Sequence, residues 1–349
     1  MAKQINPSLA RLWQKHDERR YGAEKHRLIK VTSEADHRAL DLLESGLTND
    51  QFLNLEQLAK IKREPLQALL EQLGPLVTTT SSFIPSLTPR EVEQRFTEIL
   101  RIYANGDQDP ALVMQQRKLA KVYVSTIGRA GLVAARGLYN LGVGLIATFD
   151  GTRVKAKDTS ELGYRVAQIG IPRHQALREL LDKPKSAFEL HTKLNDSLSK
   201  VDCALLIQSD VINPESYQPW MTRDAAHIAI TFTETGARVS QLVVPGITPC
   251  LACNELQRMT EDSSWLQTAT QLTGFDRDFA DTSLLLTTLG IALGRIVKYL
   301  DSGLLSYLDN RELVIDHQTG YVKEFATPEI NCGCRPELDI PRVGDLKLS

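Results

Sequence analysis

The chain has little imbalance of charge and no long uninterrupted apolar run. Its 349 residues include 41 Lys and Arg against 43 Asp and Glu, which gives a formal net charge of -2 at pH 7. A surface that binds nucleic acid or an anionic membrane needs clustered Lys and Arg, so we expect neither partner. The most apolar stretch, Leu284–Leu300, is interrupted by Gly290, Gly294, Arg295 and Lys298. We therefore interpret it as a buried helix and not as a membrane span.

Several common signals are also missing. The first residues, Met-Ala-Lys-Gln-Ile-Asn-Pro, contain no apolar signal region, so we expect a cytoplasmic protein. There is no G-x-S-x-G nucleophile motif, and the seven histidines show no H-x-x-x-H spacing. Serine-hydrolase and histidine-metal chemistry are therefore disfavoured.

Four of the five cysteines form two close pairs. Cys250 and Cys253 follow the turn-rich segment Val-Pro-Gly-Ile-Thr-Pro, and Cys332 and Cys334 follow Thr-Pro-Glu-Ile-Asn. Thiolates from two such loops can converge to complete a tetrahedral zinc site. Two short-range disulfides, or cysteines that are merely buried, are the alternatives. The fifth, Cys203, lies in an apolar run and is expected to be a buried hydrophobic side chain.

Residues 1–80 are predicted to form a small winged-helix domain. A short strand over His26–Thr32 precedes three amphipathic helical patterns, the first of which begins after Ser33, a good N-cap. In a winged helix that binds DNA the recognition helix is basic. The third pattern, Glu64–Leu73, has two Glu and no Lys or Arg. Peptide binding is therefore the favoured use of this domain.

The rest of the chain is predicted to be an α/β domain reached through a connecting segment. Residues 81–115 begin with Thr, Ser and Pro, as a linker does, and continue into a crossover helix over Pro89–Ala104. In residues 116–349, apolar strand-like runs alternate with helical patterns, which favours a Rossmann-like fold with a mainly parallel sheet. The predicted strands are Lys121–Ser125, Leu145–Phe149, Val201–Ile207, His227–Phe232 and Ala237–Val244.

The first two of these strands enclose a glycine turn, Thr126-Ile-Gly-Arg-Ala-Gly131, and the second strand ends in Asp150. Small residues in such a turn let backbone N–H groups approach a phosphate at the start of the following helix. The acid can then accept a ribose hydroxyl. The order strand, turn, helix, strand, acid predicts a nucleotide-binding fold. A nicotinamide-dependent oxidoreductase shares this turn but does not explain the cysteine pairs.

Together these motifs resemble the ThiF/MoeB/ubiquitin-activating superfamily, whose members adenylate a C-terminal carboxylate with ATP and carry a structural zinc. The similarity covers residues 110–335 and rests on the glycine turn, Asp150, Ile169–Arg173, Ser209-Asp210 and the cysteine pairs. A closer resemblance is to the ThiF-like proteins of thiazole/oxazole-modified microcin biosynthesis, in which this fold follows a winged helix that binds a leader peptide. That resemblance rests on Val244–Cys253, Trp265, Gln271-Leu272 and Asn331–Cys334.

The resemblance has mixed implications for the site. Arg173 matches the family's phosphate-contacting Lys, and Asp210 matches its magnesium-associated Asp, so these two would be catalytic in an active enzyme. However, Arg129 replaces a glycine of the family's G-x-G-G-x-G turn, and it either binds phosphate or fills the site. Asp158 and Glu161 stand where the family has Asn and Arg, and carboxylates there would oppose a polyphosphate. The residues expected to bind ATP with magnesium are thus Gly128, Arg129, Gly131, Asp150, Arg173 and Asp210.

Two functions follow as expectations. The leading one is a scaffold that holds a leader peptide or small protein and presents it to a modifying enzyme, such as a YcaO-type cyclodehydratase, with a degraded nucleotide site. The alternative is an active ATP-dependent adenylyltransferase acting on a peptide or small-protein carboxylate. No cysteine lies between Cys253 and Cys332, so transfer through a thioester is not expected. Superfamily members commonly pair as homodimers, and the helix over residues 284–300 either contributes to such an interface or is buried within one subunit.

Overall fold

The computed structural model describes residues 2–24, 27–80, 84, 86–105, 108–181, 188–190, 201–273, 275, 277–302, 310–327 and 332–335. The chain forms two compact units, Met1–Lys118 and Leu119–Ser349. Three predicted features fall wholly or partly outside the described residues: the start of the first predicted strand at His26, part of the linker, and Asn331 of the second cysteine motif.

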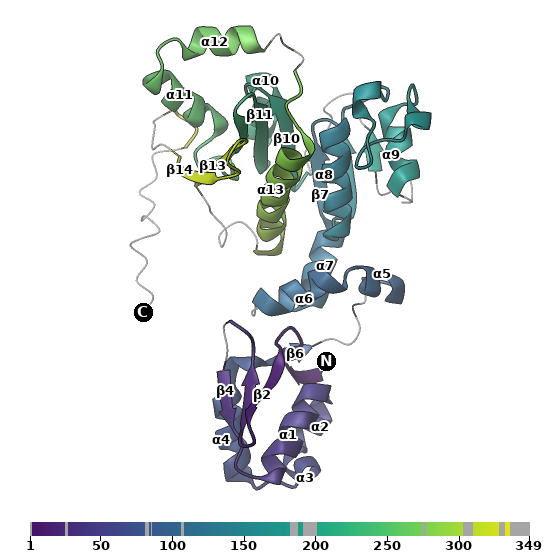
Figure 1. Ribbon diagram of the computed structural model, residues 1–349, viewed down its shortest axis with the longest axis vertical. Helices are drawn as coiled ribbons and strands as arrows, with labels where there is room; N and C mark the ends of the chain where they lie inside the picture. The colour runs from purple at the N-terminus through teal and green to yellow at the C-terminus, as the bar shows by residue number, and fades with distance from the viewer. Residues whose placement is uncertain are drawn as a thin grey trace. The chain divides into compact units, whose positions relative to one another are not determined.

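Unit 1 contains two small antiparallel sheets and a group of short helices (Figure 1). One sheet has the strand order β5-β1-β6 and the other β2-β3-β4. The strands are β1 (Ala2–Ile5), β2 (Arg11–Lys15), β3 (Glu18–Tyr21), β4 (Arg27–Lys30), β5 (Leu47–Thr48) and β6 (Val77–Thr80). The helices are α1 (Glu34–Ser45), α2 (Asn49–Leu53), α3 (Leu55–Ala59) and α4 (Arg63–Leu73), which is followed by the 3-10 helix η1 (Gly74–Leu76).

The helices of unit 1 lie where the amphipathic patterns predicted them. The Ser33 hydroxyl accepts from the Asp36 N–H at 3.2 Å, and the Asp36 carboxylate accepts from the Ser33 N–H at 3.0 Å, a capping box that starts α1. The second predicted helix is divided into α2 and α3, because the backbone leaves helical geometry at Asn54. The apolar faces of α1 and α4 pack on the sheets through Ile5, Tyr21, Ile29, Leu40, Leu43, Leu69 and Leu73.

The segment after β6 differs from the prediction of one crossover helix over Pro89–Ala104. It forms α5 (Pro89–Gln94) and α6 (Phe96–Asn105), which are separated at Arg95, where φ is -108° and ψ is 19°. The Arg95 guanidinium pairs with Glu91 one turn earlier. Helix α7 (Pro110–Leu119) follows. A small apolar cluster joins α6 and α7 to the segment before α5, and Val92 of α5 packs against it; its buried members are Ile84, Leu87, Ile99, Ile102, Tyr103, Val113 and Met114.

Unit 2 is built on one eight-stranded sheet with the order β14-β13-β12-β11-β10-β7-β8-β9. The pairs from β9 to β11 are parallel and those from β11 to β14 antiparallel, as expected for a mainly parallel α/β sheet. The strands are β7 (Lys121–Val124), β8 (Leu145–Thr148), β9 (Phe188–Leu190), β10 (Cys203–Ser209), β11 (His227–Thr233), β12 (Gly236–Val239), β13 (Arg311–Asp316) and β14 (Val322–Ala326). The strand predicted over Ala237–Val244 is therefore shorter than expected.

Helices cover both faces of this sheet because its central strands are apolar on both sides. In β10, Cys203 and Leu205 join one core, whereas Ala204 and Leu206 join the other. The first core contains α8 (Arg129–Asn140), α9 (Arg173–Leu181) and α13 (Thr282–Ser302); the second contains α10 (Pro214–Thr222) and α11 (Leu251–Glu261). Cys203 is fully buried, as predicted.

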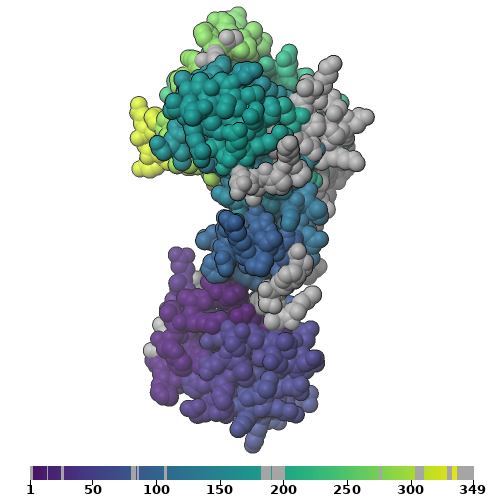
Figure 2. Space-filling view, turned by 90° about the vertical axis from the view of Figure 1, so that its right-hand side faces the viewer, coloured from purple at the N-terminus to yellow at the C-terminus, as the bar shows by residue number. Residues whose placement is uncertain are grey.

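Two helices of unit 2 differ strongly in their packing. Helix α13 is long and apolar enough to cross a membrane, but half of its most apolar window is buried, and it packs on β11, β12 and α8. It is therefore a core helix of this unit. Helix α12 (Trp265–Leu272) has no buried residue, and Figure 2 shows it in light green at one end of the unit.

The turn between β7 and α8 requires a glycine at position 131. A Cβ atom there would lie 1.7 Å from the Thr126 carbonyl oxygen. We predict that Gly131→Ala lowers the free energy of unfolding by at least about 1–3 kcal/mol, as overpacking does. Gly290→Ala, in α13, is the matched control because nothing lies within 4 Å of its added Cβ. It should be neutral or stabilise the chain by about 0.5–1 kcal/mol. Equal losses in urea denaturation would contradict this account.

Candidate functional site

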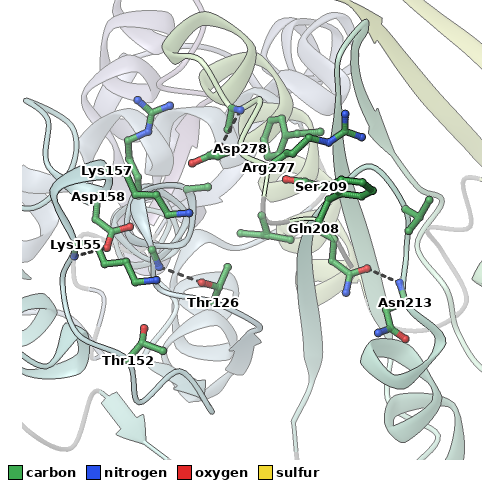
Figure 3. Close-up of a pocket in the computed structure, with 18 of the residues that line it drawn as sticks. Thr126, Thr152, Lys155, Lys157, Asp158, Gln208, Ser209, Asn213, Arg277 and Asp278 are labelled. Atoms are coloured by element: carbon green, nitrogen blue, oxygen red, sulfur yellow. Dashed lines mark hydrogen bonds between the residues drawn. The ribbon is translucent and has the colours of Figure 1, made fainter. Parts of the chain in front are cut away.

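A pocket of about 440 Å³ lies at the carboxyl ends of β7, β8 and β10 (Figure 3). The chain continues from β7 to β8 on one side and later returns to place β10 on the other side of β7. This change of direction is the point at which open α/β sheets bind ligands. Figure 3 shows Lys155, Lys157 and Asp158 on one side of the pocket and Gln208, Ser209 and Arg277 on the other.

Asp150, the acid predicted to bind a ribose hydroxyl, is bonded to the glycine turn. Its Oδ2 accepts from the Ile127 N–H at 2.9 Å and from the Thr126 hydroxyl at 3.0 Å, while Oδ1 accepts from the Thr152 N–H at 3.0 Å. Burial on its own would raise the pKa of Asp150, but these hydrogen bonds and the Arg173 charge outweigh it and lower that pKa. The Gly128 N–H donates to the Thr126 hydroxyl at 3.2 Å. Two N–H groups of the turn are thus bonded within the protein.

Arg173, the first residue of α9, is held between two carboxylates. Its Nε and Nη2 donate to Asp158 at 3.1 and 2.7 Å, and its Nη1 donates to Asp150 at 2.8 Å. The three side chains are only 10%, 4% and 6% exposed for Arg173, Asp158 and Asp150. The cation predicted to contact phosphate therefore has its charge matched by a buried pair of acids. Tyr164 supports this arrangement, since its hydroxyl donates to the Ile127 carbonyl at 2.6 Å.

Asp210, the acid predicted to associate with magnesium, is paired with an arginine. It directly follows β10, with a left-handed φ of 64°, and its side chain is 1% exposed. Arg277 Nε donates to Asp210 Oδ2 at 3.0 Å, and Nη2 donates to Oδ1 at 2.6 Å. The guanidinium also lies 5.3 and 5.2 Å from the ring centres of Phe275 and Phe279. Both oxygens of Asp210 already accept from Arg277, so a magnesium ion at Asp210 would have to displace that guanidinium.

Of the other predicted residues, some line the pocket and one does not. Arg129 lines the pocket, and its Nε is buried without a hydrogen-bond partner among the described residues. Glu161 is exposed and does not line the pocket, so only Asp158 of the two predicted acids faces it. The lining contains five cations, Arg129, Lys155, Lys157, Arg173 and Arg277. The lining contains two carboxylates, Asp158 and Asp278, whereas Asp150 and Asp210 pair with Arg173 and Arg277, so the cations of the lining outnumber its acids.

The four paired cysteines meet in unit 2, as predicted. Their sulfur atoms all lie within 4.8 Å of one another, and the shortest separations are 3.1 Å for Cys253–Cys332 and 3.6 Å for Cys250–Cys332. A disulfide needs about 2.05 Å, and all four are free thiols. A tetrahedral ion with metal–sulfur bonds of roughly 2.3 Å needs sulfurs about 3.8 Å apart. The cluster can therefore hold a metal ion.

The start of α11 favours a thiolate in this cluster. Cys250 is the N-cap of that helix, where the backbone N–H groups stabilise negative charge. Hydrogen bonding from the Cys253 thiol lowers the pKa of Cys250 to about 5, although burial opposes it. Cys253 is fully buried, and Cys332 and Cys334 are partly exposed.

The fold and the pocket define an α/β protein with a mainly parallel central sheet, and solved structures share this fold. No protein-family model and no curated protein matches the sequence. The structure of E. coli MccB aligns with a TM-score of 0.68 and 15% identity, over 97% of this chain and 98% of that one. The microcin C7 biosynthetic enzyme MccB in complex with N-formylated MccA aligns with 0.65 and 16%, over 94% and 97%. PaaA aligns with 0.60 and 19%, over 80% and 97%. At these identities the similarity confirms the expected α/β fold and is a statement about fold alone.

The Arg173 ion pairs generate a prediction on stability. Arg173→Gln leaves Asp150 and Asp158 buried without this cation and should lower the free energy of unfolding by about 3–5 kcal/mol. Adding Asp158→Asn removes one of the two buried carboxylates that then repel each other. The double variant should therefore be more stable than the sum of the two single losses implies, with a coupling of about 0.5–3 kcal/mol.

The matched control for this cycle is the pair Arg311–Glu324, in which the two side chains are 50% and 54% exposed. Removing that pair should change stability by no more than about 1 kcal/mol. Urea denaturation of the single and double variants measures both couplings. Strictly additive losses for Arg173 and Asp158 would contradict the arrangement described.

Proposed function

We propose that this protein is a peptide-binding scaffold with a ThiF fold, which presents a leader or partner peptide to a modifying enzyme. One observation carries the proposal: the charged groups that an adenylating site needs are paired with each other. Arg173 is neutralised by Asp150 and Asp158, and Asp210 by Arg277. Adenylation needs unpaired cations to offset the charge that develops on the α-phosphate. A site in which these groups are paired with each other can keep its architecture without that chemistry.

The peptide site in this proposal lies in unit 1, as a winged-helix recognition domain. Strand β4 forms one edge of the β2-β3-β4 sheet and lies beside α4. An extended peptide can add to such an edge through main-chain hydrogen bonds. Solved structures of MccB support a peptide partner by analogy, since that protein has been solved with MccA.

Several finer assignments belong to the same proposal. The functional boundaries would be 1–80 for peptide recognition, 81–115 for the connection and 116–349 for the ThiF-like domain. The modifying enzyme would be of the YcaO type or another enzyme that acts on the bound peptide, and the pair would act in the cytoplasm. A homodimer is a further expectation of the resemblance.

The nucleotide site provides the test of the scaffold. We predict no binding heat for magnesium-ATP up to millimolar concentration in isothermal titration of the wild-type chain. The double variant Asp158→Asn with Arg277→Ala removes one carboxylate partner of Arg173 and the arginine partner of Asp210. It should bind magnesium-ATP at least about tenfold more tightly than the wild type, a difference of about 1.4 kcal/mol. Arg258→Ala is the control, because Arg258 also bridges two acids, Glu255 and Glu312, but lies away from the pocket. Micromolar binding by the wild type would contradict the scaffold.

The second candidate is an ATP-dependent adenylyltransferase, and the pocket itself favours it. Lys155, Lys157 and Arg129 line a cavity at the point where this fold binds ligands. Solved structures of MccB with ATP show that a protein of this fold can hold the nucleotide. Pyrophosphate exchange in the presence of the acceptor peptide discriminates the two functions. Exchange above background supports the enzyme, and its absence together with peptide binding supports the scaffold.

We also propose that the ion held by the four cysteines is zinc. An all-thiolate tetrahedral set is the donor arrangement that structural zinc prefers. Such an ion would connect the N-terminus of α11 to the segment at Cys332 and Cys334, far along the chain. Its role would be structural, because all four positions of a tetrahedron are filled by sulfur.

Metal analysis of the purified chain should find one equivalent of zinc. Cys250→Ser should lower the metal content. It should also lower the free energy of unfolding by more than about 4 kcal/mol, which is exceptional for a single substitution. Cys203→Ala is the matched control, since Cys203 is equally buried but lies outside the cluster. It should leave the metal content unchanged. A metal-free chain that melts at the same temperature would refute the structural role.

A further inference from the structure

The outer edge of β4 is regular and presents its main chain outward. The Val31 N–H donates to the Asp17 carbonyl at 2.8 Å, which shows which residues of β4 form hydrogen-bonded pairs with β3. In an antiparallel pair, residues that are hydrogen-bonded to the neighbouring strand alternate with residues that are not. The N–H and C=O groups of Leu28 and Lys30 therefore point away from β3. Within the described residues, β4 has no strand on that side.

The opposite edge of the same sheet is less suited to receive a strand. Strand β2 pairs with β3 through a register shift between Trp13 and Lys15. Such an irregularity bends an edge and interrupts its row of hydrogen-bonding groups. A peptide that extends this sheet would therefore add to β4.

One outward group of β4 has a replaceable partner. The Lys30 N–H donates to the side-chain oxygen of Gln72 at 3.2 Å, and both residues are exposed. The Arg27 guanidinium donates to the Gln72 and Leu73 carbonyls at the end of α4, which holds the strand beside that helix. A peptide carbonyl can take the place of the Gln72 amide oxygen without removing any buried contact.

The solvent face of the sheet carries two rows of side chains that end at β4. One row runs Leu12, Arg20, Leu28, with Leu12 45% and Leu28 42% exposed. The next row runs Lys15, Glu18, Lys30, and its first two members form an ion pair of 3.8 Å. The charges in this second row alternate, and its last member, Lys30, lies at the open edge.

We propose that the peptide bound at β4 carries an acidic residue opposite Lys30 and an apolar residue opposite Leu28. The acid continues the charge alternation of one row, and the apolar residue covers the exposed leucine at the end of the other. Because every pair in this sheet is antiparallel, the added strand runs antiparallel to β4. The recognised sequence is then acidic-x-apolar from the N- to the C-terminus. The inference rests on the proposed peptide-binding function and specifies the class of peptide.

The test is a selection of random peptides of about 12 residues, twice the length of an average strand, displayed on phage against the full-length chain. We expect the acidic-x-apolar motif to be enriched on the wild type. Lys30→Glu should instead select Lys or Arg at the first position. A synthetic peptide with an acidic first residue should bind the wild type about two- to fivefold more tightly than the same peptide with a basic first residue. Lys30→Glu should reverse this order by a similar factor. Lys15→Glu, in the same row but at the far edge, is the matched control and should leave the selected motif unchanged.

The outcomes separate this inference from the function on which it rests. Peptides that bind but show the same motif on the wild type and on Lys30→Glu overturn the acidic-x-apolar rule while leaving a peptide-binding scaffold in place. Enrichment of no peptide on either chain overturns both. Leu28→Glu gives a second reading of the register, because it should replace the apolar preference by Lys or Arg two positions after the acid. Both substituted side chains are exposed, so circular dichroism should show folded variants.

Discussion

The guanidinium of Arg173, placed between Asp158 and Asp150, holds together the segments that form one side of the pocket. Asp150 also accepts from the turn after β7, and Asp158 also accepts from the Lys155 N–H at 2.8 Å. One cation therefore fixes the glycine turn, the loop after β8 and the start of α9. Removing such a charge from water costs several kcal/mol, and here two carboxylates offset that cost. The same bonds that make the arrangement stable leave the cation unavailable to a phosphate.

The pair formed by Asp210 and Arg277 repeats this principle on the other side of the pocket. Asp210 is buried, whereas 39% of the Arg277 side chain is exposed, so solvent reaches the pair mainly through the arginine. A metal ion would have to displace a guanidinium that donates twice and is flanked by two phenylalanine rings. The ion pairs on both sides of the pocket thus oppose the binding of a phosphate at Arg173 and of a metal ion at Asp210. The function that we propose uses instead the open sheet edge of unit 1, where main-chain groups point outward.

The parts of the structure that depend on local patterns could be predicted from the sequence. The strand-turn-helix-strand order gave β7, α8 and β8, and the two cysteine pairs indicated a shared site before any distance was known. Arg277 was missed because no spacing relates it to Asp210, and only the folded chain brings the loop before α13 to the end of β10. Strands β1 to β3 were missed because sequences such as Glu-Arg-Arg-Tyr in β3 contain no apolar alternation. Glu161 was expected at the pocket from alignment alone, but it is exposed and does not line the pocket.

Arg173 and Arg277 should both stay bound to their acids in the presence of nucleotide. Nuclear magnetic resonance of the arginine Nε–H groups tests it directly, because Arg173 Nε and Arg277 Nε each donate to a carboxylate, at 3.1 and 3.0 Å. We predict two signals that exchange slowly with water and do not move when millimolar magnesium-ATP is added. Shifts of both signals on titration with magnesium-ATP, with saturation, would show that the ion pairs open for the nucleotide and would contradict the account.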